Sequence, residues 1–491
     1  MNAIPRLLVA AAHKSSGKTT VALGLAAALA ARGLAVQPFK KGPDYIDPMW
    51  LARAARRPCF NLDLHLMAGG KVDALFDQRS AGADLALVEG NHGLYDGLAL
   101  DGSDSNAALA HRLAAPVLLV VDARGTTRGI APLLLGYQGF DPALRIGGVV
   151  LNRVGGARHE ARLREVIGRY TTLPVLGVLH EQPALALAER HLGLMPAAEV
   201  DDADARIAAI ARAVGDAVDL DAVLALARSA GPLPSRDELA NAAPTLAPRS
   251  AASRRVRIAV ARDRAFGFHY ADDLDAMQAA GAELHFFDTL HDERLPDCDG
   301  LFIGGGFPEA CMQALADNAA LRGTIRAAIE GGLPTYAECG GLMFLARSIA
   351  WQGRRLPMVG AIPADVVMHA RPVGRGYMRV RETAAMPWAG GGDEPLRGHE
   401  FHHSTLVDVD PSVRYAYRVE RGHGIDGAND GLVVHRLLAS YLHRRGVGGD
   451  GWPARFVDWV RGCAAAPGLN EPASARKASH DPAAMAAELT A

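Results

Sequence analysis

The stretch A-A-H-K-S-S-G-K-T-T, residues 11–20, is the strongest indication of the fold of the first half of this chain. It follows a short apolar run at 6–12 and opens an alanine-rich segment with helical character. A strand that turns into a helix through G-K-T is the setting of a phosphate-binding loop, whose backbone N–H groups hold the phosphates. Ala12 stands where the usual pattern has its first glycine, so an ordinary strand-to-helix turn is the alternative.

If the loop binds a nucleotide, its side chains have different roles. Lys18 would reach the terminal phosphates, and the Thr19 hydroxyl would ligate Mg²⁺. The residues predicted to bind the nucleotide are Ser16, Gly17, Lys18, Thr19 and Thr20.

Apolar runs alternate with helical segments through the first half of the chain. Strands that alternate with helices pair in parallel, and continuous apolar runs indicate a sheet that is covered on both faces. We therefore predict an open α/β domain with a mostly parallel sheet. Beyond 6–12, its strands are predicted at 34–39, 85–88, 116–122, 147–151 and 174–179.

Two acidic loops follow strands of this predicted sheet. The stretch K-K-G-P-D-Y-I-D-P (40–48) places Asp44 and Asp47 just past one strand, and V-E-G-N-H-G-L-Y-D-G (88–97) places Glu89 at the end of another. Ligands of open α/β sheets bind at the carboxyl ends of the strands, so these loops should share an edge with the phosphate loop. A phosphate cradle beside carboxylates needs a cation, and Mg²⁺ is the usual one.

Composition restricts the class of protein. The chain has 491 residues, 22% of them charged, with a net charge of −2, which leaves no electrostatic footprint for nucleic acid or an anionic membrane. Its five cysteines are scattered, as is typical of the reducing cytosol, and no apolar run reaches the roughly 18 residues that span a bilayer. We expect a cytoplasmic protein that binds neither nucleic acid nor membrane.

The length exceeds what one hydrophobic core supports, so more than one domain is expected. We predict a nucleotide-binding domain at 1–228, a linker rich in proline, serine and alanine at 229–254, a second α/β domain at 255–465 and a disordered tail at 466–491. Strands of the second domain are predicted near 257–261, 283–287, 300–303 and 334–337.

One cysteine of the second domain has a distinctive setting. Cys339 lies in G-L-P-T-Y-A-E-C-G-G-L-M-F-L (332–345), where an apolar strand meets small residues and a helix follows at once. This pattern predicts a nucleophile elbow, with the helix N-terminus favouring the thiolate. The alternative is a buried, inert cysteine. Upstream, L-F-I-G-G-G-F-P-E (301–309) offers free backbone N–H groups, at Gly305 and Gly306, that would stabilise an oxyanion.

These motifs together resemble a known family. G-P-D-Y-I-D-P (42–48) and V-E-G-x-x-G-L-Y-D-G (88–97) are similar to signatures of the glutamine-hydrolysing corrin amidoligases, within them the cobyrinate (or hydrogenobyrinate) a,c-diamide synthases. The resemblance implies a nucleotide domain similar to dethiobiotin synthetase, whose phosphate loop also tolerates loss of the first glycine. It further implies a class I glutamine amidotransferase domain, with ATP, glutamine and a corrin carboxylic acid as substrates.

The resemblance also implies roles for particular side chains. Those expected to surround Mg²⁺ are Thr19, Asp47 and Glu89. Those expected near the carboxylate being activated are Asp44, Tyr45 and Asp96. A role for Asn152 near the adenine and a purely structural role are both open.

The catalytic histidine is assigned by the family pattern small-x-Y-x-H, which gives His443 as the partner of Cys339. In the wider amidotransferase class a glutamate stands two residues after this histidine, but here that position is Arg445. The site is therefore either a Cys–His dyad or one that recruits another acid. A merely structural His443 is the alternative.

The expected reaction is amidation of the a and c side chains of cobyrinic or hydrogenobyrinic acid, through an acyl phosphate and ammonia released from glutamine. Within the class, the alternatives are cobyric acid synthase and the amidoligase that acts on nickel-sirohydrochlorin. From a different class comes a deviant phosphate-loop regulatory ATPase fused to an inactive domain. A homodimer is left open.

Overall fold

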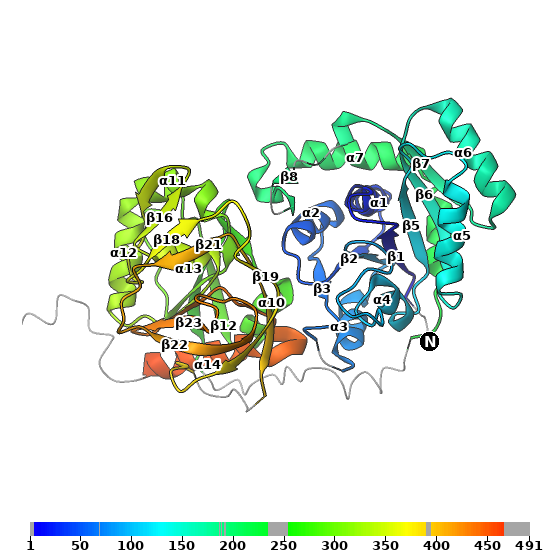
Figure 1. The fold of residues 1–491 in the computed structure, drawn as a ribbon. Helices are drawn as coiled ribbons and strands as arrows, with labels where there is room; N and C mark the ends of the chain where they lie inside the picture. The colour runs from blue at the N-terminus through cyan, green and yellow to red at the C-terminus, as the bar shows by residue number, and fades with distance from the viewer. Residues whose placement is uncertain are drawn as a thin grey trace, which may run out of the picture.

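The structure is a computed structural model that describes residues 4–67, 69–185, 187, 189–190, 193–233, 254–388 and 394–465. Two α/β bodies lie side by side, one from each half of the chain (Figure 1). The predicted linker at 229–254 lies largely outside the described residues, and the predicted tail at 466–491 lies entirely outside them. The division of the chain at these boundaries stays a prediction.

The N-terminal body is built on a seven-stranded sheet of order β3-β2-β4-β1-β5-β6-β7. Every neighbouring pair of its strands is parallel, so the predicted parallel α/β sheet is confirmed. The central place of β1 puts the loop that follows it in the middle of the carboxyl edge. The strands are β1 (Arg6–Ala11), β2 (Val36–Lys41), β3 (Phe60–Leu62), β4 (Leu85–Glu89), β5 (Val117–Asp122), β6 (Ile146–Val154) and β7 (Val175–His180).

Helices cover both faces of this sheet. Leu7 and Val9 belong to one hydrophobic core and Leu8 and Ala10 to the other, because successive side chains of a strand point to opposite faces. The first core includes α1 (Lys18–Ala31), α2 (Ile46–Ala55), α7 (Ala203–Ala217) and α8 (Leu220–Arg228). The second includes α3 (Lys71–Ser80), α4 (Asn106–Arg112), α5 (Ile130–Phe140) and α6 (Ala157–Tyr170).

The C-terminal body contains a ten-stranded sheet of order β12-β10-β13-β15-β24-β23-β22-β19-β20-β25. In this spatial order, the neighbours from β12 through β15 to β24 pair in parallel, whereas the neighbours from β24 through β22 to β25 pair antiparallel. The strands are β10 (Val256–Ala261), β12 (Ala282–Phe287), β13 (Gly300–Ile303), β15 (Thr335–Glu338), β19 (Gly374–Glu382), β20 (Leu396–His402), β22 (Arg414–Arg421), β23 (Asn429–Val434), β24 (Leu437–Ser440) and β25 (His443–Arg444).

Smaller sheets and helices complete the two bodies. One small sheet is formed by β16 (Ser348–Trp351), β17 (Arg354–Pro357), β18 (Asp365–Met368) and β21 (Ser404–Val407). Two-stranded sheets are formed by β11 (Phe266–Phe268) with β14 (Gly305–Gly306), and by β8 (Glu189–Arg190) with β9 (Gly193–Leu194). The C-terminal helices are α10 (Ala271–Ala279), α11 (Met312–Asp317), α12 (Ala319–Glu330), α13 (Gly340–Leu345) and α14 (Trp452–Ala465).

In the described part of the chain, no helix combines the length and the apolar character that crossing a membrane requires.

Candidate active site

The phosphate loop joins the end of β1 to α1 at the carboxyl edge of the first sheet. Gly17 adopts a φ of 85°, and a Cβ there would lie 2.0 Å from the side-chain nitrogen of Asn152. Only glycine satisfies both the left-handed backbone and this close approach. The Asn152 amide donates a hydrogen bond of 2.9 Å to the Ser16 carbonyl, so Asn152 braces the loop.

Position 12, where the usual phosphate-loop pattern has a glycine, accommodates the alanine of this chain. It is buried and does not adopt a positive φ, so its methyl group brings no backbone strain. Its amide donates to the Val120 carbonyl at 3.0 Å, and its carbonyl accepts a hydrogen bond from the Tyr137 hydroxyl. The loop therefore keeps its shape through contacts that an alanine provides as well as a glycine does.

The strand ends bring charged side chains to this loop. Lys18 Nζ lies 2.5 Å from Glu89 Oε1, and the Thr19 hydroxyl donates to the same oxygen at 2.6 Å. Thr19 also lies 3.5 Å from Asp47 Oδ2. Burial lowers the pKa of Lys18, and the Glu89 carboxylate acts in the opposite direction. The residues predicted to hold phosphate and metal thus meet at one edge.

A second lysine, missed by the sequence interpretation, lies among these carboxylates. Lys40 is 1% exposed; its ammonium is hydrogen-bonded to Asp47 and lies 3.3 Å from Glu89 and 3.7 Å from Asp44. Burial lowers its pKa, but the three carboxylates outweigh that cost and raise the pKa well above its ordinary value. The signal in the sequence was a lysine pair at the end of a strand, followed by the acidic loop.

The charged cluster formed by Lys18, Thr19, Lys40, Asp44, Asp47 and Glu89 fits a magnesium ion that is bound together with a nucleotide. Among the described residues, no three His, Cys, Asp or Glu side chains gather into a metal site made of protein alone. Mg²⁺, however, usually takes one or two carboxylates and completes its shell with phosphate and water. Glu89 Oε2 is buried without a hydrogen-bond partner in the described chain, which leaves one carboxylate oxygen for such a cation.

The three residues expected near the substrate carboxylate lie in different surroundings. Asp44 accepts hydrogen bonds from the backbone N–H groups at the start of α2, at 2.9 and 3.0 Å. Asp96 accepts one from Gly93 in the loop after β4, at 2.9 Å. Tyr45 turns away from both and is buried against the C-terminal body, among the rings of Phe268 and Tyr270. A direct contact between Tyr45 and the substrate stays a prediction.

In the C-terminal body, Cys339 lies between β15 and α13. It is 7% exposed and has φ 46° and ψ −98°, a strained conformation for a residue with a side chain. Its backbone N–H donates to the Ser440 carbonyl at 2.7 Å, which ties the turn to the end of β24. Strain at a strand-to-helix turn is the hallmark of an elbow that presents a nucleophile.

The glycine loop after β13 packs directly on this turn. A Cβ on Gly340 would lie 2.8 Å from the Gly306 nitrogen, and a Cβ on Gly305 would lie 2.6 Å from His443 Cε1. Side chains at these positions would separate the loop from the cysteine and the histidine. The structure thus brings together the residues predicted as nucleophile, base and oxyanion loop.

The acid beside His443 is Glu338, the residue directly before Cys339. Glu338 Oε2 lies 3.2 Å from His443 Nδ1, and both side chains are buried. Burial lowers the pKa of His443, but interactions with the Cys339 sulfur and the Glu338 carboxylate raise it to about 10.

Arg445, at the position where a glutamate was expected, points elsewhere. Its guanidinium is buried and forms two hydrogen bonds of 2.6 Å with Asp272. It also donates to the Asn61 carbonyl of the N-terminal body at 3.1 Å. Arg445 therefore joins the two bodies, and the acid near His443 comes from another strand.

We expect the Glu338→Gln substitution to lower the pKa of His443. Removal of a negative charge at 3.2 Å destabilises the imidazolium, and such a charge typically changes a pKa by about 1–3 units. The measurement is an NMR titration of protein with labelled histidines, in which the His443 signal is assigned by its absence from His443→Ala. Glu382→Gln, which removes a carboxylate from the same domain, is the control, and an unchanged titration of His443 in Glu338→Gln would contradict the assignment.

Comparison with protein families finds a match in each of the two bodies. Residues 7–194 match the model of the CobQ/CobB/MinD/ParA nucleotide binding domain, and residues 257–446 match the CobB/CobQ-like glutamine amidotransferase domain. The first match covers the phosphate loop and its carboxylates, and the second covers Cys339 and His443. Fold and site thus define a glutamine-dependent amide synthase with a nucleotide-binding domain.

Whole-length relatives narrow this class. The cobyrinate a,c-diamide synthase of Magnetococcus marinus is 47% identical over 459 residues, covering 92% of this chain and 97% of the relative. That of Methanosarcina acetivorans is 39% identical, covering 90% and 93%. The hydrogenobyrinate a,c-diamide synthase of Streptomyces coelicolor is 41% identical, covering 94% and 98%. The chain belongs to the cobyrinate a,c-diamide synthase family.

Proposed function

We propose that this protein converts two carboxylates of a corrin, the a and c side chains of cobyrinic or hydrogenobyrinic acid, into amides. It uses ATP to activate each carboxylate and glutamine as the source of nitrogen. The observation that carries this proposal is that residues 44–47 contact both the phosphate-loop cluster and the site of Cys339 and His443. Asp44 and Asp47 take part in the charged cluster at the phosphate loop, and Tyr45 between them lies against His443.

In the C-terminal body, the Cys339 thiolate attacks the side-chain amide carbon of glutamine. The tetrahedral oxyanion accepts hydrogen bonds from backbone N–H groups of the Gly305–Gly306 loop. His443 donates its proton to the departing nitrogen, so that ammonia leaves and a thioester remains on Cys339. Water, deprotonated by His443, then attacks the thioester and releases glutamate.

In the N-terminal body, a substrate carboxylate oxygen attacks the γ-phosphorus of ATP, which yields an acyl phosphate and ADP. Lys18 and the backbone of the loop bind the phosphates, and Lys40 offsets the charge of the surrounding carboxylates. Thr19, Asp47 and Glu89 would hold Mg²⁺, which when bound neutralises phosphate charge. Ammonia then attacks the acyl carbon and phosphate leaves, because phosphate is a far better leaving group than the original oxygen.

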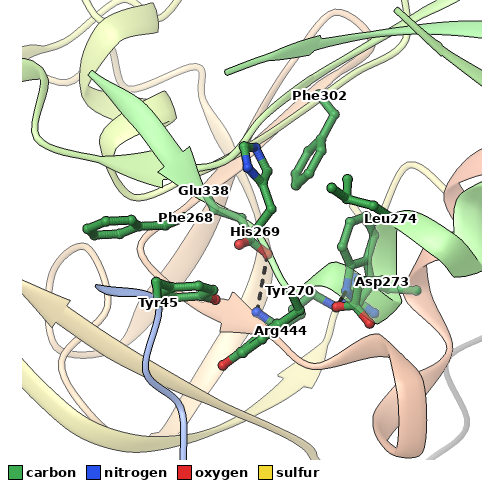
Figure 2. Close-up of a pocket in the computed structure, with 10 residues that line it drawn as sticks. Tyr45, Phe268, His269, Tyr270, Asp273, Leu274, Phe302, Glu338 and Arg444 are labelled. Carbon is green, nitrogen blue, oxygen red and sulfur yellow. Dashed lines mark hydrogen bonds between the residues drawn. The ribbon is translucent and has the colours of Figure 1, made fainter. Parts of the chain in front are cut away.

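Ammonia has to remain unprotonated between the two centres, because ammonium has no lone pair to attack with. Around Tyr45, the contact between the bodies is buried and aromatic, which supports a sheltered passage. A small cavity lies there, lined by Tyr45 and Glu338 among others (Figure 2). The cytoplasmic location and the homodimer considered above stay predictions.

The test is incubation of the protein with ATP, Mg²⁺, glutamine and either cobyrinic or hydrogenobyrinic acid, followed by mass spectrometry. We expect mono- and diamide on at least one of the two corrins. Reactions without ATP, and with ammonium in place of glutamine, separate the two half-reactions. If neither corrin changes mass with glutamine or with ammonium, the proposed substrate is wrong. A side-by-side comparison of the two acids also assigns the metal state of the substrate.

A further inference from the structure

One side chain of the nucleotide-binding body lies inside the glutamine-hydrolysing site. Tyr45 directly precedes α2, yet its ring stacks on Phe268 with a centroid distance of 5.3 Å and an interplanar angle of 6°. It also packs against Tyr270 at 4.6 Å and His399 at 5.6 Å, and only 8% of the residue is exposed. Figure 2 shows Tyr45 reaching from the blue N-terminal segment towards residues of the other body.

The hydroxyl of Tyr45 reaches the catalytic histidine. Its oxygen lies 3.5 Å from His443 Nδ1, the same atom that faces Glu338 Oε2 at 3.2 Å. With His443 as an imidazolium, Nδ1–H is a donor, and the carboxylate and the hydroxyl are its two acceptors. This is a three-centre hydrogen bond whose longer branch comes from the other body.

Glu338 contacts the imidazole through only one of its two oxygens. Its other oxygen accepts a hydrogen bond from the Tyr336 hydroxyl at 2.6 Å and one from the Arg444 backbone N–H at 3.2 Å. The ring of His399, the neighbour of His443 in the sheet, stacks on His443 at 4.9 Å and 17° but makes no hydrogen bond to it. Tyr45 therefore supplies the second polar contact at His443 Nδ1. Because the imidazole is rigid, the contacts at Nδ1 also set the direction in which Nε2 points towards Cys339.

We propose that Tyr45 is a positioning residue of the glutamine-hydrolysing site, contributed by the nucleotide-binding body. It acts through His443, whose ring it holds in line with Cys339, and the proposal rests on the proposed role of that pair. The glutamine site is complete only when the two bodies are docked. Since Asp44 and Asp47 flank Tyr45 in the charged cluster, a single four-residue segment contacts both reaction centres.

The test is the Tyr45→Phe variant of the full chain, assayed for glutamine hydrolysis without ATP or corrin. Phenylalanine keeps the stack on Phe268 and removes only the hydroxyl. A hydrogen bond of ordinary strength corresponds to a loss of about three- to tenfold, which we expect in kcat, with KM for glutamine within about twofold of the parent protein. A residue that only packs the interface would not separate kcat from KM in this way.

Tyr377→Phe is the matched control, because it also removes a tyrosine hydroxyl from the contact between the bodies. The Tyr377 hydroxyl donates to Asp63 Oδ2 at 2.9 Å and has no contact with His443. We expect kcat of this variant to stay within about twofold of the parent, which is less than the loss of one ordinary hydrogen bond. An unchanged kcat in Tyr45→Phe, a change in KM alone, or equal losses in both variants would each overturn the proposal.

This assay also separates the proposal from the identity of the substrate. Hydrolysis of glutamine is measured without any acceptor, so a protein that fails to amidate either corrin still tests Tyr45. Equal thermal unfolding midpoints for the parent and both variants verify that the fold is intact. A lower midpoint in Tyr45→Phe alone, accompanied by loss of kcat, would assign the effect to folding and reject the positioning role.

Discussion

The Cys339→Ala variant will lose glutamine-dependent amidation by at least about a thousandfold, because removal of the nucleophile abolishes the thioester route. With ammonium salts as the nitrogen source, the same variant will amidate its substrate at a rate close to that of the parent protein. The sulfur lies in the C-terminal body, whereas the phosphate loop and its carboxylates lie in the other. Amidation is measured with each nitrogen source by mass spectrometry.

The control for this variant is Cys463→Ala, which removes a partly buried thiol from α14 in the same body. We expect it to amidate with both nitrogen sources. Loss of ammonia-dependent amidation in Cys339→Ala would contradict the separation of the two reactions. Full glutamine-dependent activity in that variant would instead support the interpretation of the C-terminal body as an inactive domain.

The second large effect is expected for Lys18→Met, which should lose amidation with glutamine and with ammonium alike. Removal of one charge that stabilises a transferring phosphate costs about 10²–10³-fold in rate. The fold should survive, because Lys40 remains 3.3 Å from Glu89 and keeps that buried carboxylate paired. Both reactions and the thermal unfolding midpoint are measured on the same preparations.

Two control measurements are needed to interpret the Lys18→Met result. Glutamine hydrolysis without ATP should persist, because Cys339 and His443 make no contact with Lys18. Lys71→Met, which removes a lysine charge from α3 in the same body, should keep amidation. If Lys18→Met amidates at the parental rate with ammonium, the loop does not bind the phosphate that is transferred.

Much of the first domain could be predicted from the sequence, because its signals are local. Apolar runs bounded by turns gave strands whose ends differ from the observed ones by at most three residues. β3 was missed, since three residues are too few to show a pattern. The antiparallel half of the second sheet was missed as well, because it contains no alternation of strands with helices.

The candidate site, too, has parts that could be predicted from the sequence and parts that could not. The turns that hold Lys18, Cys339 and the Gly305–Gly306 loop could be predicted, because the shape of each turn depends on neighbouring residues in the sequence. The surroundings of Lys40 could not be predicted, since they depend on three carboxylates from two separate segments of the chain. Arg445 occupies the position of the expected acid, and its sequence position gave no sign of its pairing with Asp272.

The residue pattern was enough to indicate two chemistries: a phosphate loop with carboxylates, and a thiol on a strand-to-helix turn. How these two chemistries are connected becomes visible in the folded chain alone. Glu338 meets His443 across 105 residues of chain, and Tyr45 meets it across 398. Such contacts depend on how sheets and bodies pack, because side chains far apart in sequence come within hydrogen-bonding distance only after burial of the apolar surfaces between them.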